Sequence, residues 1–245
     1  MSTISKECCS TPAVIVNPGD YQIQGSFSKV DDLDYYTIGN SDKKVILLYD
    51  ILGYHTNNFQ FSDILCKLTG YQIIVPDFFR GKPWPESDLP PKDIQKLINW
   101  AGVENGYENR VSKDLTLLIN HFNKSTPNNQ YALIGFCWGG LMLFDALNSN
   151  QFVAGIAIHP SMLTEQNFKD LKYPILLAPT EQEKDIIPFF DLISSDVKSK
   201  SELHDFTDQV HGFAAARGDF QNSENFKRVN DLLTASQHFL TKYFK

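Results

Sequence analysis

Short, nearly continuous apolar runs recur along the chain and are bounded by polar or glycine-containing stretches. A strand inside a parallel sheet is covered on both faces, so it reads as an unbroken apolar run rather than an alternating one. Five runs fit this pattern: Val45–Tyr49, Gln72–Val75, Tyr131–Phe136, Val153–Ile158 and Pro174–Ala178. A weaker sixth candidate is Glu202–Phe206.

Longer amphipathic stretches fall between these runs and predict helices. In the last one, apolar residues recur at steps of three and four, which places them on one helix face. Alternation of strands and helices predicts an α/β fold with a mainly parallel central sheet and helices on both faces. Tyr21–Ser28 and Tyr35–Ile38 are expected to form a short antiparallel hairpin before it. The expected helices are Asn58–Leu68, Lys92–Trp100, Lys113–Phe122, Gly139–Leu147, Ile187–Ser194 and Glu224–Tyr243.

The organisation along the chain indicates one folding unit. The 245 residues contain no internal repeat, and no linker rich in Gly, Pro or Ser divides them. We therefore expect an N-terminal segment over residues 1–20 and a single domain over residues 21–245.

Charge and apolar content exclude several classes of function. The net charge of −7 argues against binding to nucleic acid or to an anionic membrane, both of which call for a basic surface. No segment reaches the ~18 apolar residues of a membrane helix, and the N-terminus lacks a secretory pattern. A cytoplasmic protein with free thiols is expected. Adjacent Cys8 and Cys9 have no partners at zinc-like spacing, so neither a metal nor another cofactor is expected.

Reactive side chains gather where the predicted strands end. In parallel sheets, ligands bind beyond the carboxyl ends of the strands, so these positions are the first to inspect. The segments that follow the strands are Asp50–Gly53, Pro76–Arg80, Cys137, His159–Pro160, Thr180–Asp185 and His211–Phe213.

The third strand leads into Gly135-Phe136-Cys137-Trp138-Gly139, which has the G-x-C-x-G spacing of a nucleophile elbow with cysteine in place of serine. The glycines allow strand and helix to approach closely around a strained residue. The N–H groups at the start of the next helix favour a thiolate. The alternative interpretation is a buried structural cysteine packed among small residues.

A thiol nucleophile needs a base, and the base needs a carboxylate that orients it. Elbow nucleophiles are followed along the chain by the acid and then by the histidine. This order selects His211 as base over His159, which ends a strand and is expected to line the pocket. Asp185 is the first choice of acid, with Glu181 and Glu183 in reserve; Asp185 also suits a helix N-cap.

Together these motifs resemble those of the dienelactone hydrolase family of α/β-hydrolases, over roughly Tyr21 to the C-terminus. The resemblance implies the α/β-hydrolase fold and a catalytic triad of Cys137, His211 and Asp185. It also implies an oxyanion hole formed by the backbone N–H groups of Ile51 and Trp138. The motifs that carry it are Tyr49–Gly53, Pro76–Gly81, Gly135–Gly140, Glu183–Pro188 and His211–Phe213 with Arg217 beyond; Cys8-Cys9 is similar to a pair in fungal members.

Three further site residues follow from the resemblance. Family members place an acidic residue near the thiol, where this chain has Asp50. They use arginines to hold the carboxylate of the substrate, which implies this role for Arg80 and Arg217. From the residues alone, Arg80 is equally compatible with a surface ion pair to Asp77 or Glu86.

The leading hypothesis is therefore a hydrolase that cleaves a small, anionic ester or lactone through an acyl-enzyme on Cys137. One alternative is a non-catalytic protein that binds or senses a small ligand on a hydrolase scaffold. Another is a redox sensor with a reactive thiol. The sequence leaves open whether the protein is a monomer or a homodimer, and whether residues 83–91 and 102–109 form a lid.

Overall fold

The computed structural model describes residues 20–126, 128–149 and 151–245. Its eight strands form one sheet in the order β1-β2-β4-β3-β5-β6-β7-β8. Cys8-Cys9 and all but the last residue of the expected N-terminal segment lie outside the described residues. The strands are β1 Ser26–Val30, β2 Leu33–Ile38, β3 Lys43–Leu48, β4 Gln72–Pro76, β5 Gln130–Phe136, β6 Gly155–Ile158, β7 Ile175–Ala178 and β8 Glu202–Leu203.

The sheet is mainly parallel, which confirms the α/β prediction. Strands β4, β3, β5, β6, β7 and β8 pair in parallel with their neighbours. The predicted hairpin is present: β1 pairs antiparallel with β2, and β2 pairs antiparallel with β4. Its first strand starts at Ser26 rather than Tyr21, because the Tyr21 hydroxyl and the Gln24 backbone N–H bond to the Asp63 carboxylate on the first helix instead.

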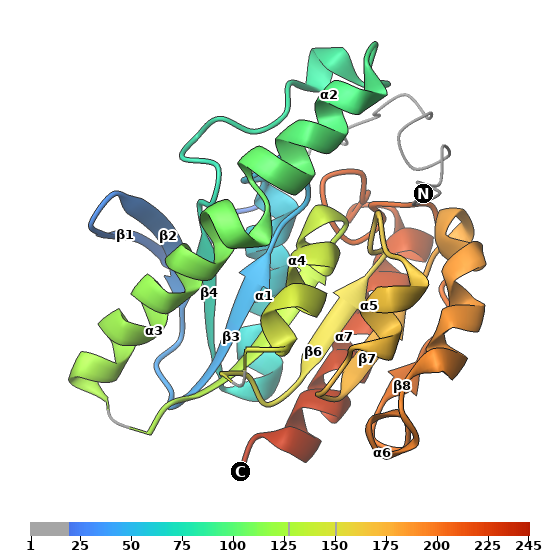
Figure 1. Cartoon of the computed structure of the whole chain (residues 1–245). Helices are drawn as coiled ribbons and strands as arrows, with labels where there is room; N and C mark the ends of the chain where they lie inside the picture. Colours follow the sequence, from blue (N-terminus) through green and yellow to red (C-terminus); the bar gives the residue numbers. More distant parts are fainter. Residues whose placement is uncertain (1–19, 127, 150) are drawn as a thin grey trace.

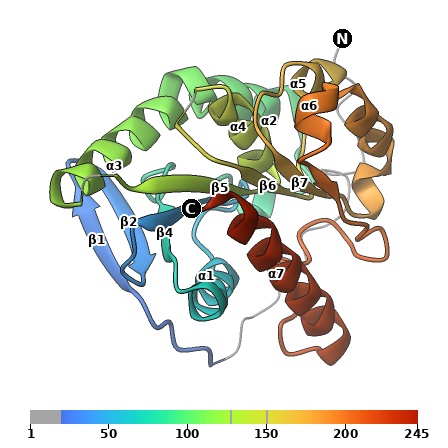
Figure 2. The same cartoon turned by 90° about the horizontal axis from the view of Figure 1, so that it is seen from below.

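Helices cover both faces of the sheet. Helices α1 and α7 pack on one face, and α3, α4 and α5 lie on the other (Figure 2). Strands β4, β6 and β7 are buried along their whole length, and β3 and β5 are buried after their first residue, as their apolar runs require. The weaker sixth strand, β8, is only partly buried. The α-helices are α1 Thr56–Thr69, α2 Ile94–Asn99, α3 Ser112–Ser125, α4 Trp138–Leu147, α5 Glu165–Lys169, α6 Ser195–Lys198 and α7 Ser223–Tyr243.

The segment after β7 differs from its prediction. In place of an α-helix over Ile187–Ser194, a 3₁₀ segment, η4, runs over Glu181–Leu192, with a kink at Glu183, whose φ of −109° and ψ of 19° are not helical. It begins six residues earlier because Thr180 and Glu183 form a capping box, in which each side chain bonds to the other residue's backbone N–H. Strands β6 and β8 are also shorter than predicted. Helices α5 and α6 are absent from the predicted helices, because they have too few turns to give a periodic pattern of apolar residues.

An irregular cap rises above the carboxyl ends of the strands between β4 and α3 (Figure 1). Helix α2 passes directly into a π-helical stretch, η2 Trp100–Glu104, and a second one, η3 Tyr107–Val111, leads into α3. A single 3₁₀ turn, η1 Glu86–Asp88, precedes them. The predicted helix over Lys92–Trp100 is thus correct in place but shorter, because Asp93 caps its start through bonds to the Gln95 and Lys96 N–H groups.

Within the described part of the chain, no helix combines the length and the apolar character that crossing a bilayer requires.

Candidate active site

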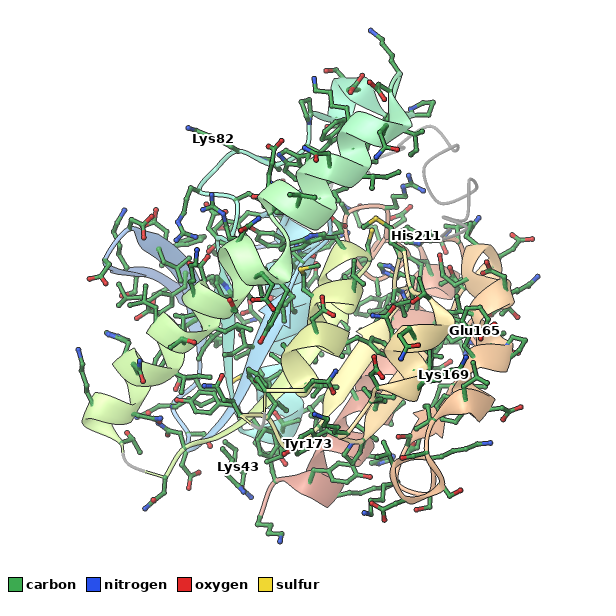
Figure 3. The ribbon with its side chains drawn as sticks, viewed as in Figure 1. Lys43, Lys82, Glu165, Lys169, Tyr173 and His211 are labelled. Carbon is green, nitrogen blue, oxygen red and sulfur yellow. The ribbon has the colours of Figure 1, made fainter. Side chains whose placement is uncertain are left out.

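The candidate site lies where the carboxyl ends of the parallel strands meet. His211 lies at the carboxyl ends of the strands in Figure 3, whereas Lys43, the first residue of β3, lies at their amino ends. The loops after β3, β5, β6, β7 and β8 all reach the carboxyl edge of the sheet, because parallel strands end on the same side. Residues distant in sequence are therefore brought together.

The turn at Cys137 has the strained geometry that the glycine spacing predicts. Cys137 has φ 52° and ψ −113°, a conformation that a side-chain-bearing residue rarely adopts. A Cβ on Gly139 would lie 2.2 Å from the Leu48 carbonyl oxygen, and one on Gly135 would lie 2.3 Å from the Gly139 carbonyl oxygen. Both glycines are therefore required for α4 to start directly beside β3 and β5.

Cys137 is buried and contacts two polar side chains at the pocket. Its sulfur lies 3.3 Å from the Ser161 hydroxyl oxygen. It also shares a side-chain hydrogen bond with His211. Ser161 is not singled out by the sequence analysis, although its position directly after the His159-Pro160 strand end is the signal that could have found it.

The carboxylate that orients His211 belongs to Glu183. His211 Nδ1 lies 2.6 Å from Glu183 Oε1, and both side chains are buried. The expectation that Asp185 fills this position is wrong, because the 3₁₀ winding of η4 leaves Asp185 exposed to solvent. Glu183 is the first buried residue of η4. The carboxylate oxygen that does not bond to His211, Oε2, is fixed by hydrogen bonds from the Thr180 backbone N–H and hydroxyl.

The opposite charges of His211 and Glu183 raise the pKa of the imidazole and lower the pKa of the carboxyl group. Burial works to lower the pKa of His211, but the Glu183 carboxylate and the negative charge of Cys137 outweigh it and raise the value to about 10. Burial works to raise the pKa of Glu183, but the His211 imidazolium outweighs it and lowers the value to about 2. The site therefore favours an imidazolium at His211 beside an ionised carboxylate at Glu183.

Asp50 is a second buried carboxyl group at the site, directly after β3. Burial, followed by the negative charge of Cys137, raises the pKa of Asp50 to about 6. Its Oδ1 accepts a 2.9 Å hydrogen bond from the Leu52 backbone N–H. Asp50 thus lies in the electrostatic field of the sulfur.

His159 packs against His211 instead of lining the pocket. The two ring centroids are 4.6 Å apart, and His159 is fully buried. Among the described residues, no group forms a hydrogen bond with either of its ring nitrogens. Burial and the adjacent His211 charge lower the pKa of His159 to about 3, so this ring is neutral at physiological pH.

A narrow pocket lies against Cys137 and His211, with about 50 Å³ of room for the centres of water molecules. Ile51 lines it. Trp138 is the first residue of α4, so its backbone N–H has no partner within the helix. The remaining lining residues are Asp50, Leu52, Leu89, Ile94, Leu97, Ile98, Ala101, Ser161, Met162, Gly212 and Arg217.

The two candidate arginines occupy different environments. Arg217 lines the pocket, and its aliphatic stem packs over Gly212, where an added Cβ would lie 3.1 Å from it. Arg80 is not at the pocket, so its expected contact with substrate is wrong. Its guanidinium instead forms a bidentate ion pair with Asp114, at 2.6 and 2.8 Å, and a second pair with Asp32. Neither partner is one of the two considered from the sequence, because both lie far along the chain.

Among the described residues, no three His, Cys, Asp or Glu side chains are placed to share a metal ion.

Comparison with known sequences gives a match to one family over most of the chain. The family model of the dienelactone hydrolase family matches residues 35–244. An uncharacterized AIM2 family protein of Schizosaccharomyces pombe is 28% identical over 243 residues, covering 91% of this chain and 94% of its own. A carboxymethylenebutenolidase homolog of Xenopus tropicalis is 24% identical over 98% of this chain and 99% of its own.

Solved structures show the same fold. A dienelactone hydrolase-like promiscuous phosphotriesterase from metagenomic libraries superposes with a TM-score of 0.64 at 14% identity, covering 91% of this chain and 99% of that chain. The arrangement of the sheet and its covering helices is that of the α/β-hydrolase fold, as the sequence motifs imply.

Proposed function

Because the chain belongs to the dienelactone hydrolase family, we propose that it hydrolyses a small ester or lactone through a covalent acyl-enzyme on Cys137. The observation that carries this proposal is the position of the buried His211 ring, which forms hydrogen bonds to Glu183 through Nδ1 and to the Cys137 sulfur. A nucleophile, a base and an orienting carboxylate in contact are the arrangement that acyl transfer needs.

In the first half of the reaction, the Cys137 thiolate attacks the carbonyl carbon and forms a C–S bond. The carbonyl oxygen becomes an oxyanion, for which the backbone N–H groups of Ile51 and Trp138 are the proposed donors. Each such donor contributes about 3–4 kcal/mol to the lowering of the barrier in comparable sites. The C–O bond to the alcohol then breaks, and the His211 imidazolium gives its proton to the leaving oxygen.

In the second half, neutral His211 takes a proton from a water molecule as that water attacks the thioester carbon. The C–S bond breaks, the carboxylic acid product leaves, and Cys137 returns to the thiolate. Glu183 acts through His211 in both halves, because its bond to Nδ1 holds the ring with the other nitrogen toward the sulfur and stabilises the imidazolium.

Arg217 is the residue we propose to bind an anionic group of the substrate. Arg217 lines the pocket. A guanidinium can hold a carboxylate through two parallel hydrogen bonds. An Arg217→Ala variant should raise the KM for an ester that carries a carboxylate about tenfold, and change the KM for the matched neutral ester little. Equal effects on both esters would exclude this role.

The proposal is tested with the purified protein and a panel of short p-nitrophenyl esters and aryl lactones. The wild-type protein should release product with saturation kinetics, and Cys137→Ala should abolish this release. Cys66→Ala is the matched control, because Cys66 is a half-buried thiol on α1 away from the pocket. Full activity in Cys137→Ala would exclude the mechanism.

A further inference from the structure

The pocket has walls of two different characters. Its polar lining residues come from the loops that follow the strands. The wall formed by the cap is apolar, and it consists of Leu89, Ile94, Leu97, Ile98 and Ala101. Met162, from the loop after β6, adds a further apolar side chain.

The cap is held at a fixed place relative to the nucleophile turn. The indole Nε1 of Trp138, the residue after the nucleophile, donates a buried 2.9 Å hydrogen bond to the Ala101 carbonyl oxygen. The Phe79 ring lies 4.7 Å from both Trp138 and Trp100, centroid to centroid, so an aromatic cluster joins the cap to the core. The apolar wall is therefore formed before any ligand binds.

Part of this wall is left exposed. Ile94 is 41% exposed, and Leu89 and Ile98 are partly exposed. Apolar side chains that face an open pocket leave surface that a hydrocarbon group can remove from water, and each buried methylene contributes to affinity.

We propose, building on the hydrolase function above, that the substrate carries a hydrocarbon group of several carbon atoms that packs against the cap wall. The scissile bond then lies at Cys137, and the anionic group lies toward Arg217. The protein thus selects amphiphilic esters or lactones rather than small, fully polar ones.

The first test is a chain-length series of p-nitrophenyl acetate, butyrate and hexanoate, with a parallel series of alkyl acetates. In at least one series, kcat/KM should rise roughly threefold to fourfold per methylene. Ile94→Asn and Ile98→Asn should lower the ratio of long-chain to short-chain kcat/KM at least threefold. Val103→Asn is the matched control, since Val103 is 53% exposed on the same cap and does not line this pocket.

A direct binding measurement separates this proposal from the hydrolase function. Calorimetric titration of Cys137→Ala with methyl hexanoate and methyl acetate reports on the wall without any turnover. Tighter binding of the hexanoate, weakened by Ile94→Asn, supports the wall even if no ester is hydrolysed. Equal affinities, or a flat chain-length series in both kinds of ester, would overturn it.

A second inference concerns Ser161, and a different set of contacts carries it. Its hydroxyl oxygen lies 3.3 Å from the Cys137 sulfur, and its backbone N–H donates a 3.1 Å bond to the Cys137 carbonyl oxygen. The loop is held in this position by two residues in the left-handed region, His159 at φ 36° and Met162 at φ 60°. It also depends on Gly140, where a Cβ would lie 2.5 Å from Pro160.

We infer that the Ser161 hydroxyl donates a hydrogen bond to the Cys137 thiolate and positions it for attack. A hydroxyl donor stabilises the charged form of the sulfur more than the neutral form, so it favours the thiolate. Ser161 acts only through the sulfur in this scheme, and it forms no bond to the substrate.

The test is the pH dependence of iodoacetamide alkylation, followed by mass spectrometry on the peptide that contains Cys137. Ser161→Ala should shift the alkylation midpoint to higher pH by about one unit and lower kcat about tenfold, and Ser161→Thr should restore both. Ser149→Ala is the control, because that hydroxyl bonds to a backbone carbonyl at the far end of α4. An unchanged midpoint in Ser161→Ala would overturn the inference.

Discussion

Two buried carboxyl groups flank the Cys137–His211 pair, and their pKa values are shifted in opposite directions. Glu183, after β7, faces the imidazolium and has its pKa lowered to about 2. Asp50, after β3, faces the sulfur and has its pKa raised to about 6. Both groups are buried, so burial alone does not explain the difference. The sign of the neighbouring charge decides which group stays ionised and which becomes easier to protonate.

The comparison assigns the two groups different tasks. Glu183 is held ionised by the imidazolium and by its bonds with Thr180, so it can stabilise positive charge on His211. The negative charges of Asp50 and Cys137 repel each other, and a proton on Asp50 removes this repulsion. We therefore expect the loss of the Asp50 charge and the loss of the Glu183 charge to change the free energy of unfolding at neutral pH in opposite directions.

The largest expected effect is that of Glu183→Gln on catalysis. Without the carboxylate, His211 loses both the partner of Nδ1 and the charge that stabilises its imidazolium form. We expect kcat to fall about a thousandfold, in line with removal of the acid from other triads. Asp185→Asn, two residues away and exposed, should keep wild-type kcat. A loss in Asp185→Asn with activity kept in Glu183→Gln would reverse the assignment.

The second effect is on stability, measured as urea unfolding free energy between pH 3 and pH 8. The raised pKa of Asp50 means that the folded state binds this proton more tightly, so stability falls as pH rises from about 4 to 6. Asp50→Asn removes this dependence and should be more stable than the wild type above pH 6, by up to about 3 kcal/mol. The Asn can still accept the bond from the Leu52 N–H.

Glu183 should show the opposite dependence in the same experiment. Its lowered pKa contributes stability that is present above about pH 4.5 and is lost as pH falls toward 2. Glu183→Gln should therefore be less stable than the wild type at neutral pH and approach it in acid. Parallel curves for the two variants would contradict the contrast between the two carboxyl groups.

The smallest of these effects is expected for Thr180→Val. Its hydroxyl donates to the Glu183 oxygen that does not face His211, and the side chain is fully buried. Removing this donor should cost about 1–2 kcal/mol of stability and lower kcat about tenfold, because the carboxylate is less well fixed. Kinetics and urea unfolding of the same sample measure both. Unchanged kcat would mean that the capping bonds do not position the acid.

The turn at Cys137 could be predicted from the sequence because the residues that shape it lie together in the chain. The conformation of Cys137 and the close approach of Gly135 to Gly139 act within five residues. Gly139 also has to pass the Leu48 carbonyl on β3, but the need for a glycine there is recorded in the same short spacing. The parallel strands were equally predictable, because burial on both faces leaves an apolar run.

The identity of the acid could not be predicted in the same way. Glu183 and Asp185 follow the same strand, and the choice between them depends on 3₁₀ winding and on the capping box at Thr180. The role of Arg80 depended on Asp114 and Asp32, which are 34 and 48 residues away. The π-helical stretches of the cap give no periodic pattern that the sequence could reveal.

Identifying the acylated residue tests acyl transfer through Cys137 most directly. The protein is mixed with a p-nitrophenyl ester, quenched in acid within milliseconds, digested, and analysed by mass spectrometry. The expected result is the mass of one acyl group on the peptide that contains Cys137, with fragment ions that place it on the sulfur. Acylation of Ser161, whose hydroxyl oxygen lies 3.3 Å from that sulfur, or turnover without any acylated peptide, would contradict it.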